Sequence, residues 1–260
     1  MLMVISPAKS LDFTPAPRGI AATAPVMAEQ TAALAQVTRK LKARDLKRLM
    51  SISDKLAQLN YERFQAFDPG GEEGVQAVLA FNGDVYTGLK ARTLDKPALA
   101  WAQAHLRILS GLYGVLRPLD VIQPYRLEMG TSLATERGGS LYAWWGDTVA
   151  SHLNRLQARE REPVVVNLAS QEYFKVTQAK AGRERVLRAR VVECVFEDWK
   201  DGNWKIISFF AKRARGMMAR HAIEQCAETP EALVDFHADG YRFAARASEP
   251  DRLVFRRRQS

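Results

Sequence analysis

Two serines and a lysine in a short polar turn have the residue types and spacing needed to bind a phosphate group. Residues 46–57, Leu-Lys-Arg-Leu-Met-Ser-Ile-Ser-Asp-Lys-Leu-Ala, predict two short helices joined by a tight turn. Backbone N–H groups at such a turn, and the positive end of the helix that follows it, attract a phosphate. Because Ser51 and Ser53 lie in the turn and Lys55 follows it, we expect these three residues to contact a phosphate backbone.

The segment 46–66 resembles the helix-hairpin-helix element with which many DNA-repair proteins hold duplex DNA. Ser51 and Ser53 stand where that element usually has glycines, which adopt a positive φ and allow close approach. The serine hydroxyls could instead cap the second helix or donate to the same phosphate. An ordinary pair of antiparallel helices is the alternative, and the segment alone does not decide between the two.

A second basic feature is a helix predicted over residues 211–226. Its basic residues share one broad arc of the helix surface, and small and apolar residues lie on the opposite side. The basic residues are Lys212, Arg213, Arg215 and Arg220, and those opposite are Ala211, Ala214 and Met218. Gly216 lies within the arc and could let a backbone or a phosphate come close. We interpret the arc either as a DNA-binding face or as the solvated face of an amphipathic helix.

Lys9 is the best single candidate for chemistry, because it directly follows a predicted first strand and loops at strand ends often assemble sites. It could act as a nucleophile or as an electrostatic anchor. Asp84, Glu128 and Asp147 are the candidate acids and bases. Asp84 and Asp147 each follow an aromatic residue and a glycine at the start of a predicted helix, so we expect each to cap that helix.

Further charged residues accompany these candidates. Arg126 lies two residues before Glu128 on a strand predicted over 125–129, so both face the same side. Glu172 and Lys175 occupy another turn-like segment, and we count Arg126 and Lys175 among the predicted DNA contacts. The alternative for all these groups is a structural network of ion pairs, which such residues form more often than they form a site.

The patterns typical of cofactor and metal sites are missing from the sequence. Four histidines and two cysteines show no zinc-type spacing, and there is no glycine-rich phosphate loop or dinucleotide fingerprint. His221 and Glu224 are one helical turn apart, but two ligands do not make a metal site. We therefore predict no cofactor, no bound metal and no recognisable catalytic signature.

Composition favours a polyanionic partner. The chain of 260 residues has 38 Lys and Arg against 29 Asp and Glu, a formal net charge of +9, and 47% hydrophobic residues for a core. The apolar start, residues 1–5, lacks a basic leader, and no apolar run is long enough for a membrane span. With only two cysteines, a cytoplasmic location is expected, with no membrane partner.

Hydrophobic patterning predicts a mixed α+β fold. We expect strands at 1–6, 106–110, 125–129, 163–168, 186–197 and 204–210, a final pair near 240–246 and 252–257, and helices from about 27 to 41 and at 45–50, 54–66, 94–105, 147–159 and 211–226. Helices and strands alternate irregularly, which favours a mixed sheet with surrounding helices over a doubly wound parallel sheet. No low-complexity linker divides the chain, so a single domain over 1–260 is predicted.

Several blocks, taken in order, resemble one family over nearly the whole chain. They are Ile5-Ser-Pro-Ala-Lys9, Ile52-Ser-Asp-Lys-Leu-Ala57, Gly83-Asp-Val-Tyr-Thr-Gly88, residues 109–120, Pro124-Tyr-Arg-Leu-Glu-Met-Gly130, Asn167-Leu-Ala-Ser170 and Lys205-Ile-Ile-Ser-Phe209. The family is that of the bacterial YaaA peroxide-stress proteins. The resemblance implies a cytosolic protein that protects against hydrogen peroxide by limiting damaging free iron, with a compact family-specific fold. It also implies duplex DNA binding through a positive cleft and a helix-hairpin-helix element, and it supplies no enzymatic reaction.

Three hypotheses follow from these features. The first is a DNA-binding stress protein that holds double-stranded or branched DNA by its phosphates with little base readout. The second is an enzyme acting on damaged DNA or a small molecule through Lys9 and neighbouring carboxylates. The third is a non-catalytic iron-handling or interaction protein.

Overall fold

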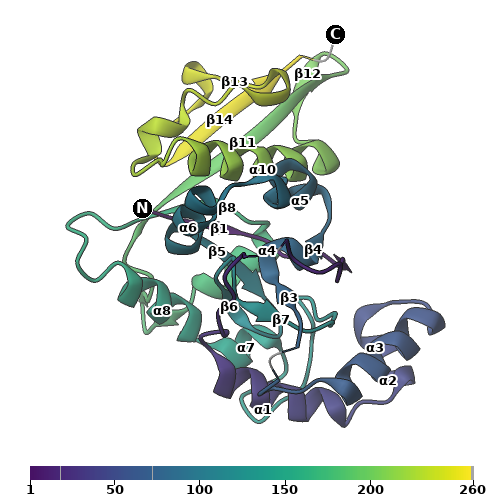
Figure 1. The fold of residues 1–260 in the computed structure, drawn as a ribbon. Helices are drawn as coiled ribbons and strands as arrows, with labels where there is room; N and C mark the ends of the chain where they lie inside the picture. Colours follow the sequence, from purple (N-terminus) through teal and green to yellow (C-terminus); the bar gives the residue numbers. More distant parts are fainter. Residues whose placement is uncertain (18, 72, 259–260) are drawn as a thin grey trace.

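A mixed β-sheet forms the centre of the computed structural model, which describes residues 1–17, 19–71 and 73–258; within these ranges the sheet has eight strands. Its order is β13-β14-β11-β8-β1-β5-β6, with β12 paired to β11 (Figure 1). The strands of the middle are joined in parallel: β14 (Arg252–Arg257), β11 (Arg190–Lys200), β8 (Val164–Leu168), β1 (Leu2–Ile5) and β5 (Leu106–Ser110). The predicted mixed α+β class is confirmed.

Antiparallel strands close the sheet at its borders and add small ladders beside it. β6 (Gly114–Leu116), β12 (Asn203–Lys205) and β13 (Arg242–Phe243) pair antiparallel with β5, β11 and β14. The small ladders are β2 (Ser10–Leu11) with β4 (Phe81–Asn82), β3 (Val75–Gln76) with β7 (Val121–Ile122), and β9 (Lys180–Ala181) with β10 (Glu184–Arg185). The parallel strands β1 and β8 are runs of β-branched and aliphatic residues because both of their faces are covered.

The six predicted helices are confirmed, with small shifts at their ends. They are α1 (Ala28–Arg39), α2 (Ala43–Met50), α3 (Asp54–Ala66), α6 (Lys96–His105), α8 (Thr148–Leu156) and α10 (Ser208–Glu224). Shorter pieces complete the chain: α4 (Ala77–Ala80), α5 (Asp84–Leu89), α7 (Leu141–Trp145), α9 (Gln171–Phe174), and the 3-10 turns η1 (Ala91–Thr93), η2 (Lys175–Thr177), η3 (Pro230–Leu233), η4 (Ala238–Gly240) and η5 (Ala245–Ala247). No helix in the described part of the chain is both long and apolar enough to span a bilayer.

Four predicted strands are wrong in whole or in part. The one over 186–197 begins only at Arg190, and the one near 240–246 is reduced to β13, because η5 begins at Ala245. Residues 125–129 alternate buried Tyr125, Leu127 and Met129 as a strand would, but this segment belongs to none of the described strands. Its backbone instead passes against the end of β5, where the Leu127 carbonyl leaves no room for a side chain on Gly111. The strand predicted over 204–210 ends at Lys205, because α10 begins at Ser208.

Helix α10 contacts β1, β8 and β11, and α5 packs against it through two glycines. A Cβ atom on Gly216 of α10 would collide with the Val85 carbonyl oxygen, and one on Gly88 of α5 would collide with the Arg213 carbonyl oxygen. The close approach predicted at Gly216 is therefore that of a backbone. The phosphate alternative at Gly216 is wrong, because α5 buries the glycine.

Helices α2 and α3 form a hairpin that projects away from the sheet at the end opposite α10 (Figure 1). Ser51 adopts the left-handed conformation, with φ 52° and ψ 49°, so a serine occupies a backbone geometry that favours glycine. The Ser53 hydroxyl accepts from the Leu56 N–H at 3.4 Å and caps α3. The two predicted helices and the serine cap are confirmed.

Candidate functional site

A cavity of about 400 Å³ opens at the carboxyl ends of the neighbouring parallel strands β1 and β8. We call it the strand-end cavity. Its walls are the connection after β1 (residues 6–10), the start of α5, the segment after β8 and the first half of α10. The carboxyl ends of parallel strands are where ligands of α/β sheets commonly bind, because the connecting loops diverge there.

Three cations from distant parts of the sequence line this cavity. Lys9 follows β1, and Lys212 and Arg215 lie one turn apart on α10. The side chain of Lys9 is 64% exposed, whereas Arg215 is partly buried. Burial lowers the pKa of Arg215. The Arg215 Nε is buried and donates to none of the described residues.

Carboxylates adjoin the cations. Lys9 Nζ lies 3.2 Å from Glu128 Oε2, and Arg126 Nη2 lies 2.9 Å from Glu128 Oε1. Arg126 and Glu128 thus face the same side, as predicted, although the segment is not a strand. The chain of charges from Lys9 through Glu128 to Arg126 is a network of ion pairs, as the structural alternative expects.

Asp84 and Glu172 complete the acidic part of the cavity wall. The Gly130 N–H donates to Glu172 Oε1 at 3.0 Å, which holds that carboxylate at the rim. Lys175 lies beside the rim, with its Nζ 4.7 Å above the Tyr142 ring, while the Tyr142 hydroxyl donates to the Glu172 carbonyl oxygen at 2.8 Å.

Hydroxyl groups that sequence reasoning missed join the two strand ends. The Ser170 N–H donates to Ser6 Oγ at 2.9 Å, and the two serine oxygens lie 3.4 Å apart. The buried Tyr86 hydroxyl donates to the Ser6 carbonyl oxygen at 3.1 Å. Position after a strand was the signal that selected Lys9, and it applies equally to Ser6 and Ser170. What the sequence does not reveal is that β1 and β8 are neighbours.

Several predicted site residues lie elsewhere. Asp147 is exposed before α8 and is not among the residues that line the strand-end cavity. Asp147 is the N-cap residue of α8, as predicted, although its side chain makes no capping hydrogen bond. The predicted cap at Asp84 is wrong, because Gly83 is the N-cap of α5. The reason at α5 is that Asp84 already belongs to the helix.

The predicted basic arc of α10 is divided by the crossing with α5. Lys212 and Arg215 face the strand-end cavity, whereas Arg213 and Arg220 line a different cavity. Arg220 donates to the carbonyl oxygens of Leu89 and Lys90, each at 3.2 Å, and so ties α10 to the end of α5.

The hairpin residues stand apart from both groups. Ser51, Ser53 and Lys55 are exposed at the tip of the α2–α3 hairpin, away from α10 (Figure 1). Lys47 Nζ lies 2.9 Å from Asp54 Oδ1, so a carboxylate and its partner already occupy the start of α3. The structure therefore gathers only part of the predicted phosphate contacts in one place.

The fold and the site define an α+β protein with a charged cavity at the ends of its central parallel strands. The chain belongs to the family of the peroxide stress protein YaaA, whose model matches residues 1–247. The UPF0246 protein of Caulobacter vibrioides strain NA1000 / CB15N is 58% identical over 259 residues, covering 100% of both chains. That of Leptothrix cholodnii is 58% identical over 259 residues, covering 99% of this chain and 98% of the relative. UPF0246 protein Bpet1601 of Bordetella petrii is 55% identical over 260 residues, covering 99% and 100%.

The family resemblance inferred from the sequence blocks is therefore confirmed. Membership supports a role in the response to peroxide stress.

Proposed function

We propose that the protein binds double-stranded or branched DNA by its phosphate backbone at the strand-end cavity, and that this binding is its part in the cytoplasmic response to peroxide. The observation that carries the proposal is the convergence of Lys9, Lys212 and Arg215 on one cavity. Asp84 and Glu172 share the wall, but Lys212 and Arg215 have no ion-pair partner among the described residues and can each donate charge-assisted hydrogen bonds to a phosphate. The formal net charge of +9 supports the same partner.

The state of each cation fits phosphate contact better than covalent catalysis. No ion pair joins Lys212 or Arg215 to the described residues, so their charge is available to a ligand. The Lys9 side chain is exposed although its partner Glu128 is half-buried, so a phosphate can reach the ammonium group, and Glu128 keeps its pair with Arg126. A lysine nucleophile must be neutral, whereas the pair with Glu128 engages Lys9 as an ammonium.

The contacts proposed here recognise the backbone and not the base sequence. Lys and Arg side chains directed at phosphates position a duplex but carry no sequence information. We therefore propose binding with little base preference. The α2–α3 hairpin, with Ser51, Ser53 and Lys55, is proposed as a second, separate phosphate contact.

Backbone binding offers a physical route to limiting iron-dependent damage. Cations condense on DNA, and protein Lys and Arg side chains that neutralise phosphates release them. Peroxide reacts with ferrous iron where the iron is bound, so release of iron from the duplex moves the reaction away from DNA. Within the described residues, no cluster of three or more His, Cys, Asp or Glu side chains could hold a metal.

Fluorescence anisotropy with a labelled duplex at several salt concentrations tests the proposal. If Lys9, Lys212 and Arg215 each neutralise one phosphate, affinity should fall roughly 40-fold between 50 and 200 mM salt. Lys9→Ala and Lys212→Ala should each lower the slope of log affinity against log salt by about 1. Arg161→Ala, an exposed basic position in the turn before β8, is the matched control and should leave the slope unchanged.

Two results would contradict the proposal. The first is the absence of duplex or branched DNA binding at low salt. The second is a salt slope that Lys9→Ala and Lys212→Ala leave unchanged.

A further inference from the structure

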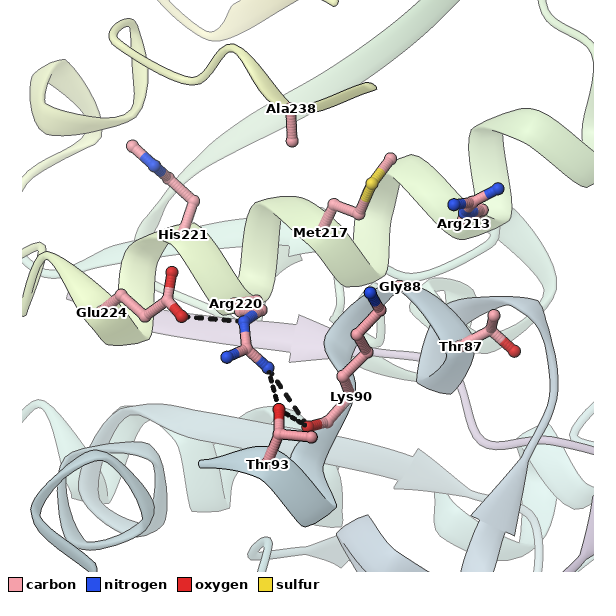
Figure 2. Close-up of a pocket in the computed structure, with 10 residues that line it drawn as sticks. All are labelled: Thr87, Gly88, Lys90, Thr93, Arg213, Met217, Arg220, His221, Glu224 and Ala238. Carbon is pink, nitrogen blue, oxygen red and sulfur yellow. Dashed lines mark hydrogen bonds and ion pairs between the residues drawn. The ribbon is translucent and has the colours of Figure 1, made fainter. Parts of the chain in front are cut away.

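We propose that a second cavity, on the other side of the α5–α10 crossing, binds a phosphate-bearing small molecule of nucleotide size. It has a volume of about 480 Å³ and lies between α10, the end of α5 and η4 (Figure 2). We call it the crossing cavity. Gly88 and Gly216 bring the two helix backbones into contact between this cavity and the strand-end cavity, so it is a separate site and goes beyond the proposed DNA binding.

The charges on its wall are unbalanced. Lys90, Arg213 and Arg220 line the cavity together with one carboxylate, Glu224. Arg220 Nε donates to Glu224 Oε1 at 2.8 Å, which accounts for that carboxylate. No ion pair joins Lys90 or Arg213 to the described residues, so the wall carries an excess of positive charge. A concave, positively charged wall concentrates the field and favours an anionic ligand.

Arg220 is positioned in advance for such a ligand. Its Nη1 donates to Thr93 Oγ1 at 2.7 Å as well as to the Leu89 and Lys90 carbonyl oxygens, and these bonds fix the guanidinium plane (Figure 2). These bonds use Nη1 and the bond to Glu224 uses Nε, so Nη2 is left without an acceptor among the described residues. A guanidinium that is held in place with donors to spare suits the oxygens of a phosphate.

Arg213 and Lys90 supply two further observations. Arg213 Nε is buried and has no hydrogen-bond partner among the described residues, a state that an anionic acceptor would relieve. Lys90 ends α5 in the left-handed conformation, with φ 50°, where glycine is the usual residue. Figure 2 shows its side chain extending from the end of α5 toward α10.

The cavity is larger than one phosphate requires. Pockets of about 300–1,000 Å³ hold ligands of drug or nucleotide size. Met217 and Ala238 give the wall an apolar part beside the cations. A phosphate with an attached organic group matches this combination, and a phosphate of the DNA backbone is the other source of the same chemistry.

Isothermal titration calorimetry of the full chain with ADP, pyrophosphate and adenosine tests the proposal. Binding of ADP and pyrophosphate is expected, and adenosine, which lacks phosphate, should not bind. Lys90→Gly keeps the left-handed backbone and Arg213→Met keeps much of the side-chain volume, so both variants should fold. Each should weaken ADP binding about tenfold, the effect of losing one charge-assisted hydrogen bond.

Lys212→Ala is the matched control, because Lys212 adjoins Arg213 in sequence but faces the strand-end cavity. It should leave ADP affinity unchanged, while Lys90→Gly should leave duplex affinity unchanged. The proposal is overturned if neither ADP nor pyrophosphate binds, if Lys212→Ala weakens ADP binding as much as Lys90→Gly does, or if Lys90→Gly weakens duplex binding and duplex displaces ADP. The last of these results would make the crossing cavity part of the DNA-binding surface. None of the three results requires the proposed DNA binding at the strand-end cavity to fail.

Discussion

Buried tyrosines hold the strand ends in place without adding charge. Burial raises the pKa of Tyr86 and Tyr125 well above the ordinary value of 10.0, so both stay neutral. A neutral phenol donates a hydrogen bond, as Tyr86 does to the Ser6 carbonyl oxygen, and the Tyr125 hydroxyl lies 2.6 Å from Ser110 Oγ at the end of β5. The charge of the strand-end cavity is therefore set by its lysine, arginine and carboxylate side chains alone.

His152 provides a residue-scale prediction about pH. Burial, with smaller contributions from Arg107, Arg155 and Arg117, lowers its pKa from 6.5 to about 4. The unfolded chain therefore binds a proton at His152 below about pH 6.5 that the native protein does not bind until about pH 4. The stability contributed by neutral His152 is present above pH 6.5 and is lost as pH falls toward 4.

We expect His152→Gln to remove this pH dependence. Between pH 7 and pH 5 the free energy of unfolding of the wild type should fall by up to about 1 kcal/mol more than that of the variant, because partial exposure of His152 lets solvent screen part of the effect. Urea unfolding at the two pH values measures both differences. Equal losses in the two proteins would show that His152 is not the group responsible.

At the scale of elements, the contact between α5 and α10 depends on two residues without side chains. A Gly→Ala change inside a helix ordinarily favours the helix by about 1 kcal/mol. At Gly216 the added methyl group would meet the Val85 carbonyl and force the helices apart. We therefore expect Gly216→Ala to destabilise the protein by about 1–3 kcal/mol, the opposite sign to its effect on helix propensity.

Chemical denaturation measures this change, with Gly202→Ala as a control. Gly202 has φ 79° in a turn with nothing within 4 Å of an added Cβ, so its substitution reports backbone strain without a collision. A Gly216→Ala variant as stable as the wild type would show that the helices adjust freely. In that case the division of α10 into two charged faces would not depend on close packing.

Element by element, local patterns predicted structure wherever one or both faces are buried over a sufficient length. The buried run of β8 and the amphipathic helices α1 and α3 are examples. The segment 125–129 shows the limit, because alternating burial is shared by a strand and by an irregular segment lying on a strand end. The parallel order of the sheet was beyond prediction, since the connection from β1 to β5 runs through residues 6–105 and no local pattern records which strands become neighbours.

At the scale of the whole molecule, the candidate site was beyond prediction for the same reason, because local patterns do not record which elements become neighbours. Lys9, Lys212 and Arg215 were recognisable one at a time as basic residues at element ends or on a helix. Their convergence arises because α10 packs over β1 and β8. Residue type and local periodicity also assigned Arg213 to the same face as Lys212, whereas the position of α5 separates them.

The α2–α3 hairpin lies apart from α5 and α10, whose residues line the strand-end cavity, which leads to a prediction about DNA length (Figure 1). A short duplex can occupy only one of two separated sites, whereas a long or branched DNA can reach both. Contributions from distant, independent sites to the free energy of binding should add. Lys55→Ala should therefore weaken binding of long DNA and lower its salt slope by about 1, with little effect on the shortest duplex that binds.

Anisotropy titrations with duplexes of increasing length, on Lys55→Ala, Lys9→Ala and the combined variant, separate the two sites. Lys9→Ala should weaken binding at every length, because the proposal places the shortest duplex that binds at the strand-end cavity, beside Lys212 and Arg215. If Lys55→Ala weakens binding of the shortest duplex as much as binding of the longest, the hairpin and not the strand-end cavity is the primary DNA contact. Effects of Lys9→Ala and Lys55→Ala that fail to add on long DNA would mean that one molecule cannot use both sites on the same duplex.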